Sequence, residues 1–386
     1  MLNLKDFFLL DPNIIFLNHG SFGATPKPVF EAYQRWQLEL ERQPVEFLGR
    51  RHNELMRASR ATLAEYVGTS ENNLVYVTNV TVGLNIVARS LILGPGDEVL
   101  TTDHEYGAMD RTWRFLAKEK GFTYTSSQVS LPLSSAAEFV EHLWESVTPQ
   151  TRVIFISQIS SPSALIFPVA EICARARSAG ILTVIDGAHV PGQIPLALDS
   201  LGADFWSGNL HKWLMSPKGS GFLYARPEVQ HFLKPLVVSW GYEAMLPGPS
   251  QFVDHHEWMG TRDPAAFLAV PDAIQFQKDH NWDLVREECF KLTTYAQDII
   301  CGLTGLPSLH QPGAQTYCQV IAMTLPENTD VVALKTRLYD EYHIEVPVHI
   351  WNGTNLIRVS VQGYNTKAEI DALYAALKAL LPQTTC

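Results

Sequence analysis

The feature that most constrains the fold is the segment 181–224, in which short apolar runs are followed at once by polar residues. The first run, 181–185, contains the β-branched residues that fill a strand buried on both faces, and it ends at Asp186. The second run, 203–207, leads to a polar stretch, and the third, 221–225, follows a glycine-rich turn. Polar groups after buried parallel strands gather in the crevice beyond the strand ends, where open α/β sheets bind ligands. The segment therefore predicts an α/β fold with a site at this edge.

An acid and an amine in one such crevice indicate a particular chemistry. Lys212 follows His211 and has apolar neighbours, so burial would lower its pKa and favour the neutral amine that forms Schiff bases with carbonyls. Asp186 can hold a heteroaromatic nitrogen protonated, which completes the lysine-plus-aspartate pattern of pyridoxal phosphate sites. Either residue alone is more often a solvated lysine or a turn-forming aspartate. Their positions after successive strands favour a cofactor site.

Composition narrows the class of protein. A chain of 386 residues predicts one large and one smaller domain, and 46% hydrophobic with 18% charged residues predicts a sizeable core. The net charge of −11 argues against nucleic acids and anionic membranes as partners. Five cysteines without a CxxC pair fit a reducing compartment and no zinc module. Without a signal-peptide core or a membrane-length apolar stretch, we expect a soluble, cytoplasmic protein.

The rest of the chain alternates strand-like and helix-like patterns between residues 74 and 225, which predicts a mostly parallel sheet. Within this region, the small polar loop 78–83 precedes a run of residues with helical spacing. Backbone N–H groups at such a helix start suit a phosphate, although an ordinary N-cap is the commoner use. The Pro- and Gly-rich segment 235–249 reads as a loop that leads away from the sheet.

The chain resembles the class V aminotransferases, pyridoxal phosphate-dependent enzymes of fold type I, in their isopenicillin N epimerase-like branch. The resemblance extends over about residues 18–366, and its motifs are Asp186-Gly187-Ala188-His189, His211-Lys212 and Gly219-Ser220-Gly221.

This resemblance implies the α/β architecture of a fold-type I transferase. A large domain would hold a mostly parallel seven-stranded sheet sandwiched by helices, and a smaller α+β domain would follow it. The implied boundaries are an N-terminal arm at 1–25 that joins the small domain, a large cofactor-binding domain at 26–255 and a small C-terminal domain at 256–386.

The resemblance also implies which residues would hold pyridoxal phosphate. Lys212 would bond to it covalently, Asp186 would pair with the ring nitrogen, and His189 with the ring hydroxyl. An aromatic side chain would cover the ring, and the register permits His104 or Tyr106. Tyr106 is preferred because small residues follow it, although such an aromatic can simply pack on the core. The other implied contacts are the Val80 backbone, Thr81, Asn209 and His211 at the phosphate, Ser161 at the cofactor, and Thr261 reaching the partner's phosphate across a homodimer with shared active sites.

Arg358 is a charged residue within the apolar strand-like run 355–360. A buried arginine needs an anionic partner, and its planar fork matches a carboxylate in two hydrogen bonds, so an internal salt bridge is one interpretation. The family resemblance instead implies that Arg358 binds the carboxylate of an amino-acid or small peptide substrate. By the same resemblance, Asn18 and His19 are candidate substrate contacts.

The predicted activity is therefore an isopenicillin N epimerase-like reaction at Cα, with Lys212 as the base and Tyr106 or His104 as proton donor on the opposite face. One alternative is a carbon–sulfur lyase that acts on a cysteine derivative, and another is an inactive relative that only binds partners. A metal hydrolase built on Asp186, His189 and His255 is a weaker alternative, and we expect no metal site. The segment 344–351 has no cysteine, which argues against a persulfide mechanism.

Overall fold

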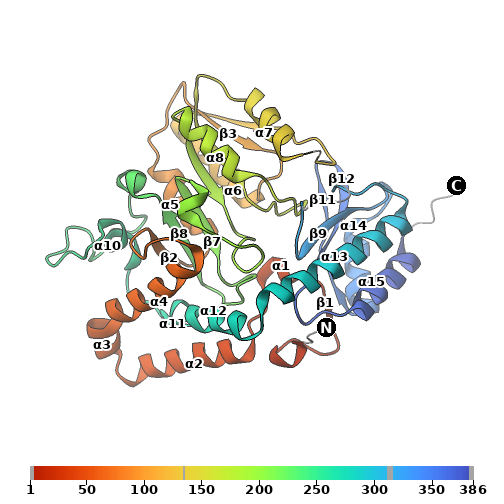
Figure 1. Ribbon diagram of the computed structural model, residues 1–386, viewed down its shortest axis with the longest axis horizontal. Coiled ribbons are helices and arrows are strands. Elements are labelled where there is room, and N and C mark those ends of the chain that lie inside the picture. Colours follow the sequence, from red (N-terminus) through yellow and green to blue (C-terminus); the bar gives the residue numbers. More distant parts are fainter. Residues whose placement is uncertain (1–3, 134, 311–315, 382–386) are drawn as a thin grey trace.

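The computed structural model describes residues 4–133, 135–310 and 316–381. Its largest element is a seven-stranded sheet with the order β2-β8-β7-β6-β5-β3-β4 (Figure 1). β8 is antiparallel to both of its neighbours, and all other pairs in this sheet are parallel. The strands are β2 (Leu74–Val77), β3 (Glu98–Thr102), β4 (Thr123–Ser127), β5 (Thr151–Ser157), β6 (Leu182–Asp186), β7 (Phe205–Asn209) and β8 (Gly221–Ala225). The predicted mostly parallel seven-stranded sheet is confirmed.

Helices cover both faces of this sheet, because alternate strand residues point to opposite sides. In β5, Val153 and Phe155 belong to one apolar cluster, whereas Ile154 and Ile156 belong to another. The first cluster takes in α5 (Val80–Ser90), α6 (Gly107–Lys120) and α10 (Gln251–Glu257). The second takes in α2 (Lys27–Arg42), α4 (His52–Val67), α7 (Ala136–Glu145), α8 (Val169–Ser178), α9 (Leu198–Leu201), α11 (Ala265–Leu268) and α12 (Val270–Asp279). The short α3 (Pro44–Glu46) links α2 to the segment before α4.

A smaller α+β assembly is formed by the C-terminal part of the chain (Figure 1). Its antiparallel sheet has the order β11-β12-β9, with β9 (Val320–Thr324), β11 (Val348–Trp351) and β12 (Thr354–Ser360). Its helices are α13 (Trp282–Thr304), α14 (Val331–Tyr342) and α15 (Lys367–Leu380). The N-terminal arm joins this assembly, because β1 (Ile15–Phe16) pairs with β10 (Ile344–Glu345), just before α1 (His19–Phe22). The exact domain boundaries at 25 and 255 stay a prediction.

The two sheets meet beyond the carboxyl ends of the parallel strands. Next to the end of β3, the Asp103 backbone carbonyl accepts a hydrogen bond of 3.0 Å from the Trp351 indole, and the Asp103 carboxylate accepts one of 2.8 Å from Asn352. Arg358 on β12 donates to Ser161, in the loop that follows β5. The hairpin of the small sheet thus closes one side of the crevice in which a ligand site is expected.

Candidate active site

The crevice holds a cavity of about 510 Å³. The last residues of neighbouring parallel strands line it: Ser157 of β5, Asp186 of β6 and Asn209 of β7. Of the residues predicted from the sequence, the cavity brings together Val80, Thr81, Tyr106, Ser161, Asp186, His189, Asn209, His211 and Lys212.

Lys212 supplies the amine of this cavity. Its Nζ lies 3.2 Å from Nε2 of His189. Burial and the positive charge of Arg358 lower the pKa of Lys212 to about 7, while the Asp186 carboxylate acts in the opposite direction. Near neutral pH a large fraction of this amine is therefore unprotonated and nucleophilic.

Asp186 supplies the acid, at the last position of β6. Burial raises the pKa of its carboxyl group to about 6, although the Ala188 N–H, 2.9 Å away, and the Lys212 amine both favour the charged form. The next residue must be glycine, because a Cβ on Gly187 would lie 1.9 Å from the ring of the buried Trp206. The chain can therefore turn away sharply from the strand and leave the carboxylate facing the cavity.

The first turn of α5 borders the same cavity. The Asn79 side chain caps this helix by accepting from the Val82 N–H at 3.0 Å. The Val80 N–H, predicted to face a phosphate, donates instead to Asn209 Oδ1 at 3.0 Å. This bond ties the end of β7 to the helix start and leaves Thr81 as the side chain there that can contact an anion.

Arg358, on β12, does not itself line the cavity but hydrogen-bonds two residues that do, Ser161 and Ser21. Its Nη1 donates to the Ser161 carbonyl oxygen at 2.5 Å, and its Nη2 to Ser21 Oγ at 3.3 Å. Its Nε is buried without a hydrogen-bond partner, and none of its partners within the described residues is a carboxylate. Burial lowers the pKa of Arg358 to about 10. Within the described residues the internal salt bridge considered from the sequence is not formed, so the positive charge of this guanidinium is not neutralised there by a carboxylate.

The two aromatic candidates occupy different places. Tyr106 lines the cavity and is 47% exposed. His104 is fully buried behind the wall, where its Nδ1 lies 2.7 Å from Ser163 Oγ and its ring packs 4.2 Å from that of Trp351. Burial lowers the pKa of His104 to about 3. Only Tyr106 of the pair is presented to a ligand.

Three further predicted residues do not line the cavity. Asn18 donates to Glu345 Oε1 at 2.7 Å, and His19 is fully buried with its Nε2 3.1 Å from the Lys212 carbonyl oxygen. The contacts of both residues support the protein framework rather than face a substrate. Thr261 is exposed in the loop after α10. A contact of Thr261 with a cofactor would require a second copy of the chain.

Glu105 is a site residue that the sequence did not reveal. Its buried carboxyl group accepts from the Ser157 N–H at 2.8 Å, from Ser157 Oγ at 2.6 Å and from Thr102 Oγ1 at 2.7 Å. Burial raises its pKa to about 8. It thereby joins the ends of β3 and β5 beside the cavity. Nothing in the sequence around Glu105 indicates that its side chain joins two strand ends.

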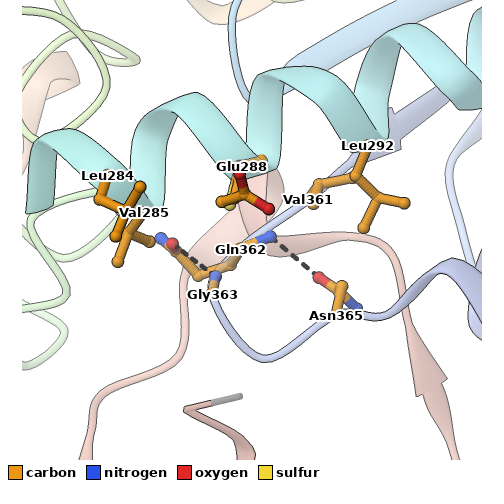
Figure 2. A pocket seen from close by; sticks show the side chains of 9 residues that line it. Leu284, Val285, Glu288, Leu292, Val361, Gln362, Gly363 and Asn365 are labelled. Atoms are coloured by element: carbon orange, nitrogen blue, oxygen red, sulfur yellow. Dashed lines mark hydrogen bonds between the residues drawn. The ribbon is translucent and has the colours of Figure 1, made fainter. Parts of the chain in front are cut away.

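Another cavity lies between α13 and the loop after β12, and Figure 2 shows its lining. Its volume of about 20 Å³ has room for roughly one water molecule, so it cannot hold a substrate. The loop beside it is stiffened by the Gln362 N–H, which donates to Asn365 Oδ1 at 2.9 Å. As for metals, no group of three histidine, cysteine, aspartate or glutamate side chains that could bind an ion occurs in the part of the chain that the structure describes.

Comparison with known proteins identifies the family. The sequence model described as "Aminotransferase class-V" matches residues 15–373. An isopenicillin N epimerase from Amycolatopsis lactamdurans is 35% identical over 390 aligned positions, which cover 98% of each chain. The chain belongs to the class V aminotransferases. A putative L-cysteine desulfhydrase from Oryza sativa subsp. japonica is 27% identical, covering 95% of this chain and 83% of the rice protein.

Solved structures support the fold of this class V aminotransferase. A variant of the cystine C–S lyase C-DES, with glycine covalently linked to its pyridoxal phosphate cofactor, superposes with a TM-score of 0.84. The two share 23% identity, and the alignment covers 97% of this chain and 99% of C-DES. With the parallel sheet described above, this likeness confirms the predicted fold type I.

The titration of Lys212 gives the first prediction. Because its folded-state pKa is depressed to about 7, its reaction with an amine-directed acylating reagent should rise with pH and level off above that midpoint. Lys291 serves as the control, because the hydrogen bonds that it donates to Glu287 and Glu288 raise its pKa. Mass spectrometry of cofactor-free protein labelled at a series of pH values would measure the extent of acylation of both lysines. A Lys212 profile that follows that of Lys291 would contradict this assignment.

Proposed function

We propose that this protein acts at Cα of an amino acid or small peptide, in a reaction like that of the isopenicillin N epimerases. It is a pyridoxal phosphate-dependent enzyme of the class V aminotransferase family. The observation that carries the proposal is one cavity lined by an amine of lowered pKa and a buried carboxylate, with an arginine that has no carboxylate partner within the described residues and is hydrogen-bonded to the lining residues Ser21 and Ser161. The amine and the carboxylate suit the cofactor, and the arginine suits an amino-acid substrate.

The chemistry of the lining residues fits pyridoxal phosphate. Lys212 would hold its aldehyde carbon covalently, Asp186 its ring nitrogen and His189 its ring hydroxyl. Tyr106 would cover one face of the ring, and Ser161 would contact the cofactor from the loop after β5. The phosphate would lie at the start of α5, with these side chains around it: Thr81, Asn209 and His211.

The cofactor, when bound, supplies an electron sink for the charge left at Cα after deprotonation. The unprotonated amine of Lys212 accepts the Cα proton, because its lowered pKa keeps it a base near neutral pH. Arg358 binds the substrate carboxylate through two parallel hydrogen bonds and so fixes which bond of Cα faces the amine. Tyr106 donates a proton from the opposite side, which inverts the configuration.

A carbon–sulfur lyase is the second candidate. It is favoured by the similarity of almost the whole chain to proteins named as L-cysteine desulfhydrases, one of them 27% identical. Removal of the Cα proton by Lys212 is common to both reactions. The substrate, rather than the base, then decides between them: a leaving group on Cβ permits elimination.

We also infer that the enzyme is a homodimer. The loop between β8 and α10, drawn in green, extends away from the sheet near the α10 label (Figure 1). It exposes large apolar side chains: Val238 (65%), Trp240 (82%), Met245 (94%) and Leu246 (93%). Several large exposed apolar side chains on one loop are typical of a surface that is buried against another protein. Thr261, in the next loop, would then reach the partner's cofactor phosphate.

A cytoplasmic location belongs to the same proposal. Cys173, Cys289, Cys301 and Cys318 are free, as a reducing compartment requires, and Cys386 lies outside the described residues. Among the described helices, none has the length and apolar character needed to cross a bilayer.

The reaction can be identified by incubating the purified enzyme with amino acids and small peptides in deuterium oxide. An epimerase incorporates deuterium at Cα and inverts it, whereas a lyase releases pyruvate and a thiol or sulfide from cysteine derivatives. For an epimerase, Tyr106→Phe should slow inversion by roughly 10²- to 10⁴-fold, the usual contribution of a general acid, while exchange catalysed by Lys212 persists. Tyr339→Phe, at an exposed tyrosine of α14, is the control. Unchanged inversion in Tyr106→Phe would contradict the role of Tyr106.

Oligomeric state gives a separate prediction. Replacing Trp240 and Leu246 together by serine should convert the dimer to a monomer in analytical ultracentrifugation, because the exposed apolar area that would be buried is lost. The monomer should retain cofactor poorly, since Thr261 of the partner is then absent. Val332→Ser, at an exposed apolar residue of α14, should leave the dimer intact. A monomeric parent protein, or a double variant that stays dimeric, would exclude this interface.

A further inference from the structure

Trp213, the residue after the reactive lysine, is fully buried and hydrogen-bonds the histidine that touches that lysine. Its indole Nε1 donates to Nδ1 of His189 at 3.2 Å. On the other side of the same ring, His189 Nε2 lies 3.2 Å from Lys212 Nζ. Three side chains thus form one continuous chain of hydrogen bonds that ends at the amine.

Which group donates and which accepts in both hydrogen bonds follows from the Trp213 indole. An indole N–H can only donate, so Nδ1 of His189 must accept and carries no proton. A neutral imidazole then has its proton on Nε2, and this N–H must donate to Lys212 Nζ. A protonated ammonium has no lone pair to accept with, so the arrangement is complete only when Lys212 is a neutral amine.

We propose that Trp213 is a positioning residue that fixes the tautomer of His189 with the proton on Nε2, and that His189 thereby donates a hydrogen bond to the unprotonated Lys212 amine. The inference rests on the proposed role of Lys212 as the reactive amine. The tautomer depends only on the protein's own side chains, and so it is the same with or without a bound cofactor, whereas the hydrogen bond to the free Lys212 amine belongs to the cofactor-free protein.

The charges around these three side chains, taken together, also favour a neutral His189 and a neutral Lys212. Lys212 experiences the charges of Arg358 and Asp186, and His189 those of Lys212, Arg358 and His211. Asp186 is the only anion among them and favours the charged form of Lys212. Burial and the positive charge of Arg358 depress the pKa of His189 well below its usual value, so the ring stays neutral and its two nitrogens remain one donor and one acceptor.

Trp213 is held both at its backbone and at its ring. The Trp213 carbonyl oxygen accepts from Gln277 Nε2 at 3.0 Å, and Gly192 approaches it so closely that a Cβ there would lie 2.2 Å from this oxygen. The ring packs 5.0 Å from that of His19, whose Nε2 donates to the Lys212 carbonyl oxygen at 3.1 Å. Lys212 is therefore held at its backbone by His19 and at its amine by His189, with Trp213 between them.

A fixed tautomer has a consequence for ligand binding. When Lys212 is engaged with the cofactor, the Nε2–H of His189 remains a donor, so that it can bind an oxygen acceptor such as a ring hydroxyl in its deprotonated form. The opposite tautomer would present a lone pair at the same place and repel that oxygen.

The test is long-range ¹H–¹⁵N NMR of the full-length protein labelled with ¹⁵N-histidine, as purified with its cofactor and after cofactor removal. The His189 signals are those that disappear in His189→Gln. We expect an unprotonated Nδ1 and a protonated Nε2 in both forms. A protonated Nδ1 in the parent protein overturns the proposal, and this result needs no folded variant.

Trp213→Phe keeps a buried ring and deletes only the N–H. In this variant the two nitrogen shifts should move toward each other, because both tautomers become populated, and the midpoint of Lys212 labelling should rise from about 7. Trp282→Phe is the matched control, since it deletes a buried indole bond of 3.1 Å to the Gly192 carbonyl oxygen. Shifts in Trp213→Phe identical to the parent's would also overturn the proposal. Failure of the proposed function would appear separately, as a cofactor held by another residue with the His189 tautomer unchanged.

Discussion

The active site depends on the burial of one lysine amine at the edge of a parallel sheet. Removal from water, together with the nearby charge of Arg358, makes the protonated form of Lys212 unfavourable, and Asp186 only partly offsets this. The amine is consequently a base and a nucleophile near neutral pH. Arg358 has no carboxylate partner in the described residues, and under the proposed function a substrate carboxylate would neutralise it. Under the proposed function, deprotonation at Cα and binding of the substrate carboxylate would thus both depend on the charges of Lys212, Asp186 and Arg358.

The sheet makes this arrangement possible through close backbone approaches. Gly187 lets the chain turn sharply after Asp186, where any larger residue would meet Trp206. Gly23, at a φ of +70°, brings the N-terminal arm against the loop that carries Lys212, since a Cβ there would lie 2.0 Å from the His211 carbonyl oxygen. The arm is thus both a strand partner of the C-terminal assembly and part of the wall behind the lysine. These close backbone contacts therefore also fix the positions of Asp186 and of the loop that carries Lys212.

Much of the fold, and the placement of Asp186 and Lys212 in one crevice, could be predicted from local sequence patterns, whereas the other cofactor contacts were implied by the family resemblance. Short β-branched runs give the buried strands, and polar residues directly after them, such as Asp186 and Asn209, must lie at the crevice. The functions of Glu105 and Trp213 could not be predicted in this way. Glu105 acts by joining two strand ends, and Trp213 by reaching a histidine that precedes it by 24 residues, so both roles exist only once the chain has folded. The choice between His104 and Tyr106 depended likewise on which side chain the turn after β3 directs into the cavity.

The measurement that tests the central claim most directly is the location of the cofactor on the chain. The purified protein should absorb in the visible range, and borohydride should bleach this band and leave the reduced cofactor on the peptide that contains Lys212, as read by mass spectrometry. Lys212→Ala should give no such adduct. An adduct on another lysine, or the absence of a visible band even after pyridoxal phosphate is added, would contradict the account.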